Sequence, residues 1–270
     1  MSDLFDPPPP DPADAVALAD YAERAYLRPS LDRSNLTLLT GGFVEKVTIE
    51  DGRATGIVVN GPLGRRSVHA AREVILCAGV FGSPKLLLLS GVGDADSLRS
   101  VGVKPLVHLP AVGRNLENHP GVDVQFATRH EDSLTAQIGT LGKAWLGARW
   151  LLTRTGLGSG NIFEAGAFLR TRDDATMPTM QYEFLPLTRR LVNGKLVPVP
   201  GFQFWMDLSR PESRGRVSLT SADPAALPSI VFNHLDVEQD VVALFNTGGV
   251  GDEEVRQLGE TWIGHNLKKA

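Results

Sequence analysis

The sequence predicts an α/β protein in two parts, and three observations support this prediction. The first is a continuous apolar run at 74–78, which stops on a glycine and is typical of a strand buried on both faces. The second is the stretch "SPKLLLLSG" just after it, which contains helix start and stop residues. The third is a series of segments beyond residue 122 in which apolar and polar residues alternate. This pattern indicates an antiparallel sheet with one solvent-exposed face.

The first part of the chain begins with a predicted helix. Residues 12–27 carry apolar side chains at helical spacing, so we expect this helix to end before Pro29. Residues 44–59 alternate around the turn sequence Glu-Asp-Gly-Arg, which predicts a hairpin. A short strand at 66–70 and a later helix within 94–103 complete this region.

The leucine run should form a short helix with recognisable ends. Ser83 is a good N-cap, and Pro84 fits the first helical position because its missing N–H would be unpaired there anyway. We therefore expect a helix over 85–90, with Gly91 as its left-handed C-cap.

Gly79 stands at the carboxyl end of the predicted strand 74–78. Ligands of open α/β sheets bind at that edge, and a residue without a Cβ lets a ligand approach the backbone. A tight turn is the alternative explanation for this glycine. A strand of this kind needs neighbours, so without them we expect a marginal or oligomeric protein.

The second part of the chain is predicted to be mostly sheet. A helix is expected over 139–152, after a first strand at 122–129. Turn-rich loops separate the remaining predicted strands, which are 163–171, 179–187, 202–209, 215–221 and 228–236.

Composition excludes several classes of protein. The net charge of -4 argues against a nucleic-acid partner, and no apolar run approaches the ~20 residues of a transmembrane helix. A single cysteine, Cys77, excludes an internal disulfide and suits the cytoplasm. No nucleotide-binding glycine loop in a strand–turn–helix context is recognised, and the histidines lack metal-ligand spacing, so no metal site is predicted.

The stretch "AGVFGSPKLLLLSGVG" (78–93) resembles the second signature of the glucose-methanol-choline (GMC) flavin oxidoreductases. Three further segments resemble blocks of that family in the same order: "VGRNLENHPGVDVQF", "ARWLLTRTGLGSGNIFEAGAFLRT" and "SRPESRGRVSLTSADPAALPSIVFNHL". The second of these is similar to choline dehydrogenases and related bacterial alcohol dehydrogenases. The likeness extends over roughly residues 20 to 240.

The resemblance implies FAD as the cofactor and identifies residues that would contact it. The backbone of Val44 would contact the adenine, and Ala78 and Gly79 would lie beside the ADP portion. Asn115 and His119 would lie near the isoalloxazine ring, although they could instead only hold a loop in place.

Glu164 is the substrate-binding residue that the resemblance implies. It matches a glutamate that faces the trimethylammonium group in choline-oxidising relatives, and Phe163, Phe168 or Trp205 could add an aromatic face. The alternative is a salt-bridged strand residue, and the same glutamate also occurs in relatives that use uncharged alcohols.

The resemblance also implies segments that we do not recognise in this chain. Family members begin with a dinucleotide-binding loop and end with a catalytic histidine segment. His265 and Asn266 lack the family context, so no catalytic residue is assigned. The implied organisation is given by these ranges: a disordered proline-rich tail (1–17), a partial FAD-binding domain with a mixed sheet (18–115), a substrate-binding domain with an antiparallel sheet flanked by helices (116–236) and a divergent tail (237–270).

Two functions remain open on this basis. One is an FAD-dependent oxidoreductase that oxidises the CH–OH group of choline or another primary alcohol, with a second copy or a companion chain supplying the missing segments. The other is a non-catalytic remnant or substrate-binding module without flavin.

Overall fold

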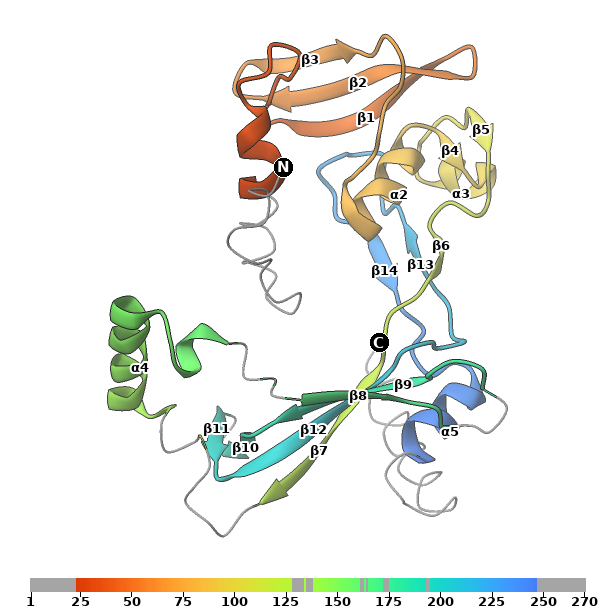
Figure 1. Cartoon of the computed structure of the whole chain (residues 1–270). Coiled ribbons are helices and arrows are strands. Elements are labelled where there is room, and N and C mark those ends of the chain that lie inside the picture. Colours follow the sequence, from red (N-terminus) through yellow and green to blue (C-terminus); the bar gives the residue numbers. More distant parts are fainter. Residues whose placement is uncertain are drawn as a thin grey trace. The chain divides into compact units, whose positions relative to one another are not determined.

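The structure of this chain is a computed structural model (Figure 1). It describes residues 23–127, 134, 138–160, 163, 165–171, 175–192 and 195–246. The chain forms two compact units. Unit 1 comprises Met1–Leu39, Gly121–Arg170 and Met180–Asp207, and unit 2 comprises Thr40–Pro120, Thr171–Thr179 and Leu208–Ala270.

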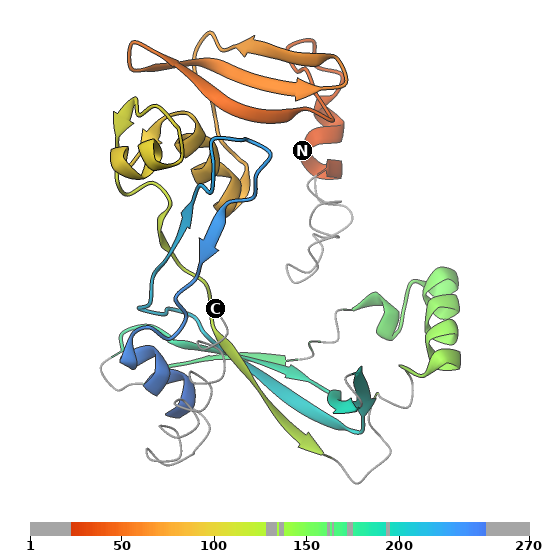
Figure 2. The same ribbon diagram turned by 180° about the vertical axis from the view of Figure 1, so that it is seen from behind.

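Unit 2 begins with an antiparallel three-stranded sheet, β1–β2–β3, whose strands lie side by side in both ribbon views (Figures 1 and 2). Its strands are β1 (Phe43–Glu50), β2 (Arg53–Gly61) and β3 (Gly64–His69). The predicted hairpin is confirmed. Asp51 and Gly52 make its turn, with φ values of 49° and 76°, which explains the Asp-Gly pair because the turn needs left-handed residues.

Helix α2 (Gly79–Leu89) contains the leucine run but starts earlier than predicted. Ser83 is not the N-cap. Its hydroxyl accepts a hydrogen bond from the Ala78 N–H (3.1 Å), so it braces the start of the helix from inside the second turn. Pro84 lies within the helix. Gly91 has φ +84°, which confirms the left-handed residue expected after the helix.

The strand predicted at 74–78 is wrong. These residues have no regular secondary structure, and no strand in the described part of the chain pairs with them. Ile75 is 73% exposed and Cys77 is also exposed. A segment with strand-like composition cannot form a ladder without a neighbour, so the mixed sheet expected here does not form among the described residues.

The core of unit 2 forms beneath α2. Leu88 packs with Leu98 and Val103, and these three side chains are at most 9% exposed. The other elements of unit 2 are β4 (Val92–Gly93) paired in parallel with β5 (Val107–His108), α3 (Ala95–Ser100), an antiparallel sheet in the order β14 (Ser229–Val231), β13 (Gly215–Ser218), β6 (Arg114–Leu116), and helix α5 (Glu238–Asn246).

Ser90 joins the first sheet to α2. Its buried hydroxyl accepts a hydrogen bond from the Val47 N–H (2.8 Å) and donates one to the Leu86 carbonyl (2.5 Å). Val47 on β1 is itself 6% exposed, so its N–H has no access to bulk water. This contact explains the serine that ends the leucine run.

We expect Ser90→Ala to destabilise unit 2 by about 1–3 kcal/mol, because it leaves the buried Val47 N–H without an acceptor. Chemical denaturation of the full chain measures this cost. Ser100→Ala is the control, since Ser100 is an exposed serine that also donates to a helix carbonyl. An equal loss of stability in both variants would contradict the role given to Ser90.

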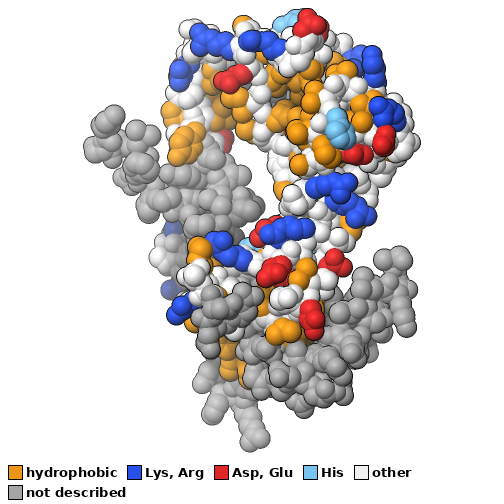
Figure 3. Space-filling view, turned by 90° about the vertical axis from the view of Figure 1, so that its right-hand side faces the viewer, with side chains coloured by type: hydrophobic (Ala, Val, Ile, Leu, Met, Phe, Trp, Pro, Cys, Tyr) orange, Lys and Arg blue, Asp and Glu red, His pale blue; other side chains and the backbone are white. Residues whose placement is uncertain are grey.

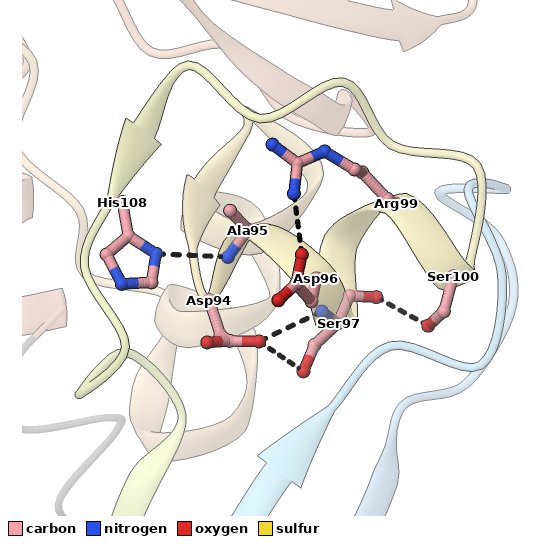
Figure 4. Close-up of polar contacts among 7 residues, drawn as sticks. All are labelled: Asp94, Ala95, Asp96, Ser97, Arg99, Ser100 and His108. Atoms are coloured by element: carbon pink, nitrogen blue, oxygen red, sulfur yellow. Dashed lines mark hydrogen bonds and ion pairs between the residues drawn. The ribbon is translucent and has the colours of Figure 1, made fainter.

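Asp94 caps helix α3 (Figure 4). Its carboxylate accepts hydrogen bonds from the backbone N–H (2.9 Å) and the hydroxyl (2.7 Å) of Ser97. The neighbouring Ala95 N–H donates to Nδ1 of His108 (3.2 Å), which ties β5 to the same helix end. The bonds from Ser97 lower the pKa of Asp94, with smaller contributions from the charges of His108 and Arg114.

The lowered pKa of Asp94 predicts a loss of stability in acid. Its charged form is favoured by folding, so the stabilisation is present above the unfolded-state pKa and disappears as the pH falls through the folded-state pKa. Asp94→Asn retains a capping oxygen but no charge. We expect it to lower the melting temperature at neutral pH and to match the parent protein in strong acid. A difference that persists unchanged at every pH would contradict this.

Unit 1 is built on an antiparallel sheet in the order β7–β12–β9–β8. The predicted antiparallel pairing is confirmed, whereas every residue of strand β8 is exposed, so the sheet does not have one buried and one exposed face throughout. Aromatic rings of Phe126, Phe202 and Phe204 gather on one face, with Phe126 and Phe202 stacked at 5.0 Å. The elements of this unit are η2 (Glu23–Leu27), η3 (Arg28–Ser30), β7 (Gly121–Ala127), α4 (Thr140–Thr153), η5 (Leu157–Ser159), β8 (Ala165–Leu169), β9 (Met180–Leu185), the hairpin of β10 (Thr188–Val192) and β11 (Lys195–Val199), and β12 (Gly201–Leu208).

Candidate functional site

Three glycines of the leucine-rich stretch have different surroundings. A Cβ on Gly91 would lie 2.6 Å from the Lys104 carbonyl oxygen, and one on Gly93 would lie 2.5 Å from the Leu88 side chain. Packing therefore requires these two glycines. A Cβ on Gly79 would meet nothing within 4 Å, although its φ is +77°. The backbone of Gly79 is thus bare and faces open space.

The first turn of α2 presents backbone N–H groups beside Gly79. The first N–H groups of a helix have no intrahelical acceptor. The Ala78 N–H is used by Ser83, whereas Gly79 and Val80 are exposed. An anionic or polar group could therefore approach this end of the helix.

Val44 lies in β1, opposite Val59. The pairing register shifts between Val44 and Lys46, so a bulge interrupts the ladder directly after Val44. Val44 is half-buried. A second register shift follows between Thr48 and Ile49, so the pairing of β1 with β2 is irregular at two places.

A short segment carries Asn115 and His119, and both residues are exposed. Asn115 has φ +58°, a left-handed conformation that asparagine tolerates better than most residues. Before it, the Gly113 carbonyl accepts a hydrogen bond from the Val217 N–H (2.6 Å). After it, the Pro120 carbonyl accepts one from the Leu208 N–H (3.0 Å). The segment is therefore fixed at both ends.

Two side-chain contacts hold the middle of this segment. Arg214 pairs with Glu117 (3.1 Å), and Nδ2 of Asn118 lies 3.1 Å from Nε2 of His234. The His234 ring stacks on Phe232 (5.0 Å), and burial lowers the pKa of His234. A neutral imidazole can accept the amide proton of Asn118, so the geometry and the pKa agree. The sequence did not single out His234, because no spacing links it to residue 118.

The predicted residues are only partly brought together. Val44, Ala78, Gly79, Asn115 and His119 all belong to unit 2, on β1, at the start of α2 and around β6. Glu164 lies outside the described residues, as do His265 and Asn266.

Unit 1 carries the aromatic candidates. Phe168 on β8 is 62% exposed and Phe163 is 42% exposed, whereas Trp205 on β12 is half-buried. Nearby on β7, burial raises the pKa of Asp123, which accepts a hydrogen bond from the Gln203 amide (3.2 Å). Phe168 is thus the most exposed of the three aromatic candidates.

The described residues contain neither a group of metal ligands nor a helix that could cross a membrane. No group of three or more histidine, cysteine, aspartate or glutamate side chains in that part of the chain is placed to hold a metal ion. None of its helices combines the length and the apolar character needed to cross a bilayer.

Comparison with known proteins identifies the family. Residues 20–121 match the N-terminal model of the GMC oxidoreductases. The chain is 39% identical over 219 residues to an oxygen-dependent choline dehydrogenase of Staphylococcus xylosus, covering 81% of this chain and 39% of that protein. It is 41% identical over 216 residues to one of Photobacterium profundum, covering 80% and 38%.

Solved structures share the fold. A formate oxidase superposes with a TM-score of 0.70 at 23% identity, covering 85% of this chain and 44% of that one. Pyridoxine 4-oxidase from Mesorbium loti gives 0.66 at 24% identity, covering 88% and 42%. The predicted α/β fold class is confirmed.

Residues 20–121 therefore match the GMC oxidoreductase family, as the motif at 78–93 indicated. The cofactor of that family is FAD, in agreement with the cofactor expected from the sequence. The chain spans about two-fifths of the length of the curated relatives it matches, with 39% and 38% of those proteins covered.

Proposed function

We propose that this chain binds FAD and contributes to the oxidation of a small alcohol. The observation that carries the proposal is the contrast among three glycines of one motif. Gly91 and Gly93 are explained by packing, whereas Gly79 keeps a left-handed backbone beside open space. A bound nucleotide would account for that space, because a side chain there would block its approach to the backbone.

The described residues of unit 2 fit the cofactor. Gly79 and the free N–H groups of α2 would hold the ADP portion, and Val44 would contact the adenine through its backbone. Asn115 and His119 would face the isoalloxazine, on a segment that Arg214 and His234 keep in place. When bound, FAD supplies the two-electron acceptor for oxidation of the CH–OH group.

The substrate that we propose is choline or a similar primary alcohol. The support comes from relatives described as oxygen-dependent choline dehydrogenases. Glu164 would face the cationic head of such a substrate, with Phe168 or Trp205 as an aromatic neighbour. We place the reaction in the cytoplasm because Cys77 is a free, exposed thiol.

A companion polypeptide or a second copy would complete the assembly. The support is exposed apolar surface in unit 2, both on the unpaired segment 74–78 and beside β5. Ile75, Leu106 and Leu109 are 73%, 50% and 48% exposed, and Figure 3 shows hydrophobic side chains at the surface of the molecule.

A flavin titration followed by a dye-reduction assay tests this function. We expect added FAD to raise the melting temperature of the full chain, and choline to reduce a redox dye in the presence of FAD and any required companion. FAD binding without turnover would instead support a binding module. No effect of FAD on melting would contradict the proposal.

A further inference from the structure

Three aromatic rings of unit 2 lie next to one another between the start of α2 and the residues that follow β14. The Phe81 ring, in the first turn of α2, meets the Phe232 ring edge to face, with centroids 6.2 Å apart and planes at 70°. Phe232 in turn stacks on His234, with centroids 5.0 Å apart and planes at 19°. All three residues are half-buried. We call Phe81, Phe232 and His234 the ring stack.

Hydrogen bonds fix the backbone on which the ring stack is built. Asn233 has φ +53° and donates from Nδ2 to the Arg214 carbonyl (3.0 Å), so the turn that carries the last two rings is tied to the residue before β13. Lys85 of α2 donates from Nζ to the Pro224 carbonyl (2.7 Å), in the loop between β13 and β14. Helix α2 and these two strands are therefore joined by hydrogen bonds as well as by rings.

The last ring of the stack uses its polar edge. Nε2 of His234 lies 3.1 Å from Nδ2 of Asn118, and an amide nitrogen can only donate, so Nε2 must accept. Burial lowers the pKa of His234, which favours the neutral ring that this bond needs. The neighbouring Glu117 is held by Arg214 (3.1 Å), whereas His119 is exposed. These two contacts therefore determine where the chain presents His119.

We propose that the ring stack couples the start of α2 to the segment of His119, and that His234 is a positioning residue which acts through Asn118. A ligand group at the start of α2 would shift the Phe81 ring, and the packed rings would pass that shift to His234 and to the amide it holds. The inference rests on the proposed function, because it takes Gly79 and His119 as two ends of one cofactor site. It differs from simple packing because it requires both the ring and the acceptor of His234.

NMR of the full chain without ligand tests the hold on Asn118. In His234→Phe the ring remains but the acceptor is lost, so the Asn118 side-chain amide should exchange with water about two- to tenfold faster. His234→Gln keeps an acceptor and should restore slow exchange. Phe81→Leu should shift the same amide resonance from the far end of the stack. His108→Phe is the matched control and should leave that resonance unchanged, because it removes an acceptor at the start of α3, where the Ala95 N–H donates to His108 (3.2 Å).

ADP is the probe for the coupling, since it carries the adenine and the diphosphate but no flavin ring. Its binding should shift the His119 imidazole resonances of the parent chain. In His234→Phe and in His234→Gln this shift should disappear while ADP still binds, because one variant lacks the acceptor and the other lacks the ring. No shift at His119 in the parent chain with ADP bound, a shift that survives in both variants, or an Asn118 amide that does not respond to Phe81→Leu would overturn the coupling. A chain that does not bind ADP would count against the proposed function, and the measurements without ligand would then decide the coupling by themselves.

Discussion

The variant Gly79→Ala should lose FAD affinity by about 10- to 100-fold, because an added methyl would occupy the space that we assign to the cofactor. The fold itself should survive. No atom lies within 4 Å of the new Cβ, so the only cost to the free protein is the left-handed backbone, about 1–2 kcal/mol. Titration of flavin fluorescence measures the affinity, and thermal melting of the same sample measures the stability.

Gly52→Ala is the matched control. Gly52 has φ +76° and also has nothing within 4 Å of its Cβ position, but it lies in the turn between β1 and β2. Both variants should therefore lose a similar amount of stability, and only Gly79→Ala should lose affinity for FAD. If both bind FAD equally well, Gly79 does not contact the cofactor and our account of the motif fails.

The variant Gly91→Ala should damage the fold strongly. It combines a left-handed residue (φ +84°) with a Cβ placed 2.6 Å from the Lys104 carbonyl oxygen. Together the backbone and packing terms amount to about 2–5 kcal/mol, a large share of the stability of an ordinary domain. We expect poor expression or a non-cooperative melt, which circular dichroism would detect.

The variant Gly64→Ala separates the cost of the left-handed backbone from the cost of the packing clash. Gly64 has φ +80°, and a Cβ there would meet no atom within 4 Å. The stability lost in Gly64→Ala therefore reports the cost of the left-handed backbone alone. The difference between the two variants then gives the packing cost at Gly91. Equal destabilisation would mean that the loop around Lys104 moves aside easily, contrary to the packing described here.

Local turn chemistry was the part of the fold that the sequence predicted best. The Asp-Gly pair at 51–52 and the glycine after the leucine run both have the positive φ expected of them. These features depend on a few adjacent residues, so a single sequence contains the information. Hairpin β10–β11 has the same kind of signal, an Asn-Gly pair at 193–194, although it is not among the strands predicted from the sequence.

Features that depend on distant residues were predicted poorly. The apolar run at 74–78 has the composition of a strand, but pairing needs a neighbour that composition cannot supply. Ser83 resembled an N-cap because sequence cannot show that α2 begins a turn earlier. The contacts of Asn118 with His234 and of Glu117 with Arg214 join residues about a hundred positions apart, so no spacing rule predicts them.

Hydrogen exchange of the full chain, with and without FAD, tests the central claim most directly. The amides at the start of α2 have no intrahelical acceptor and should exchange quickly in the free protein. We predict that FAD slows exchange of the peptide containing Gly79–Leu89 by at least about tenfold and leaves the β1–β2 turn unchanged. FAD binding that protects other segments while the first turn of α2 exchanges as before would show that the open glycine has some other purpose.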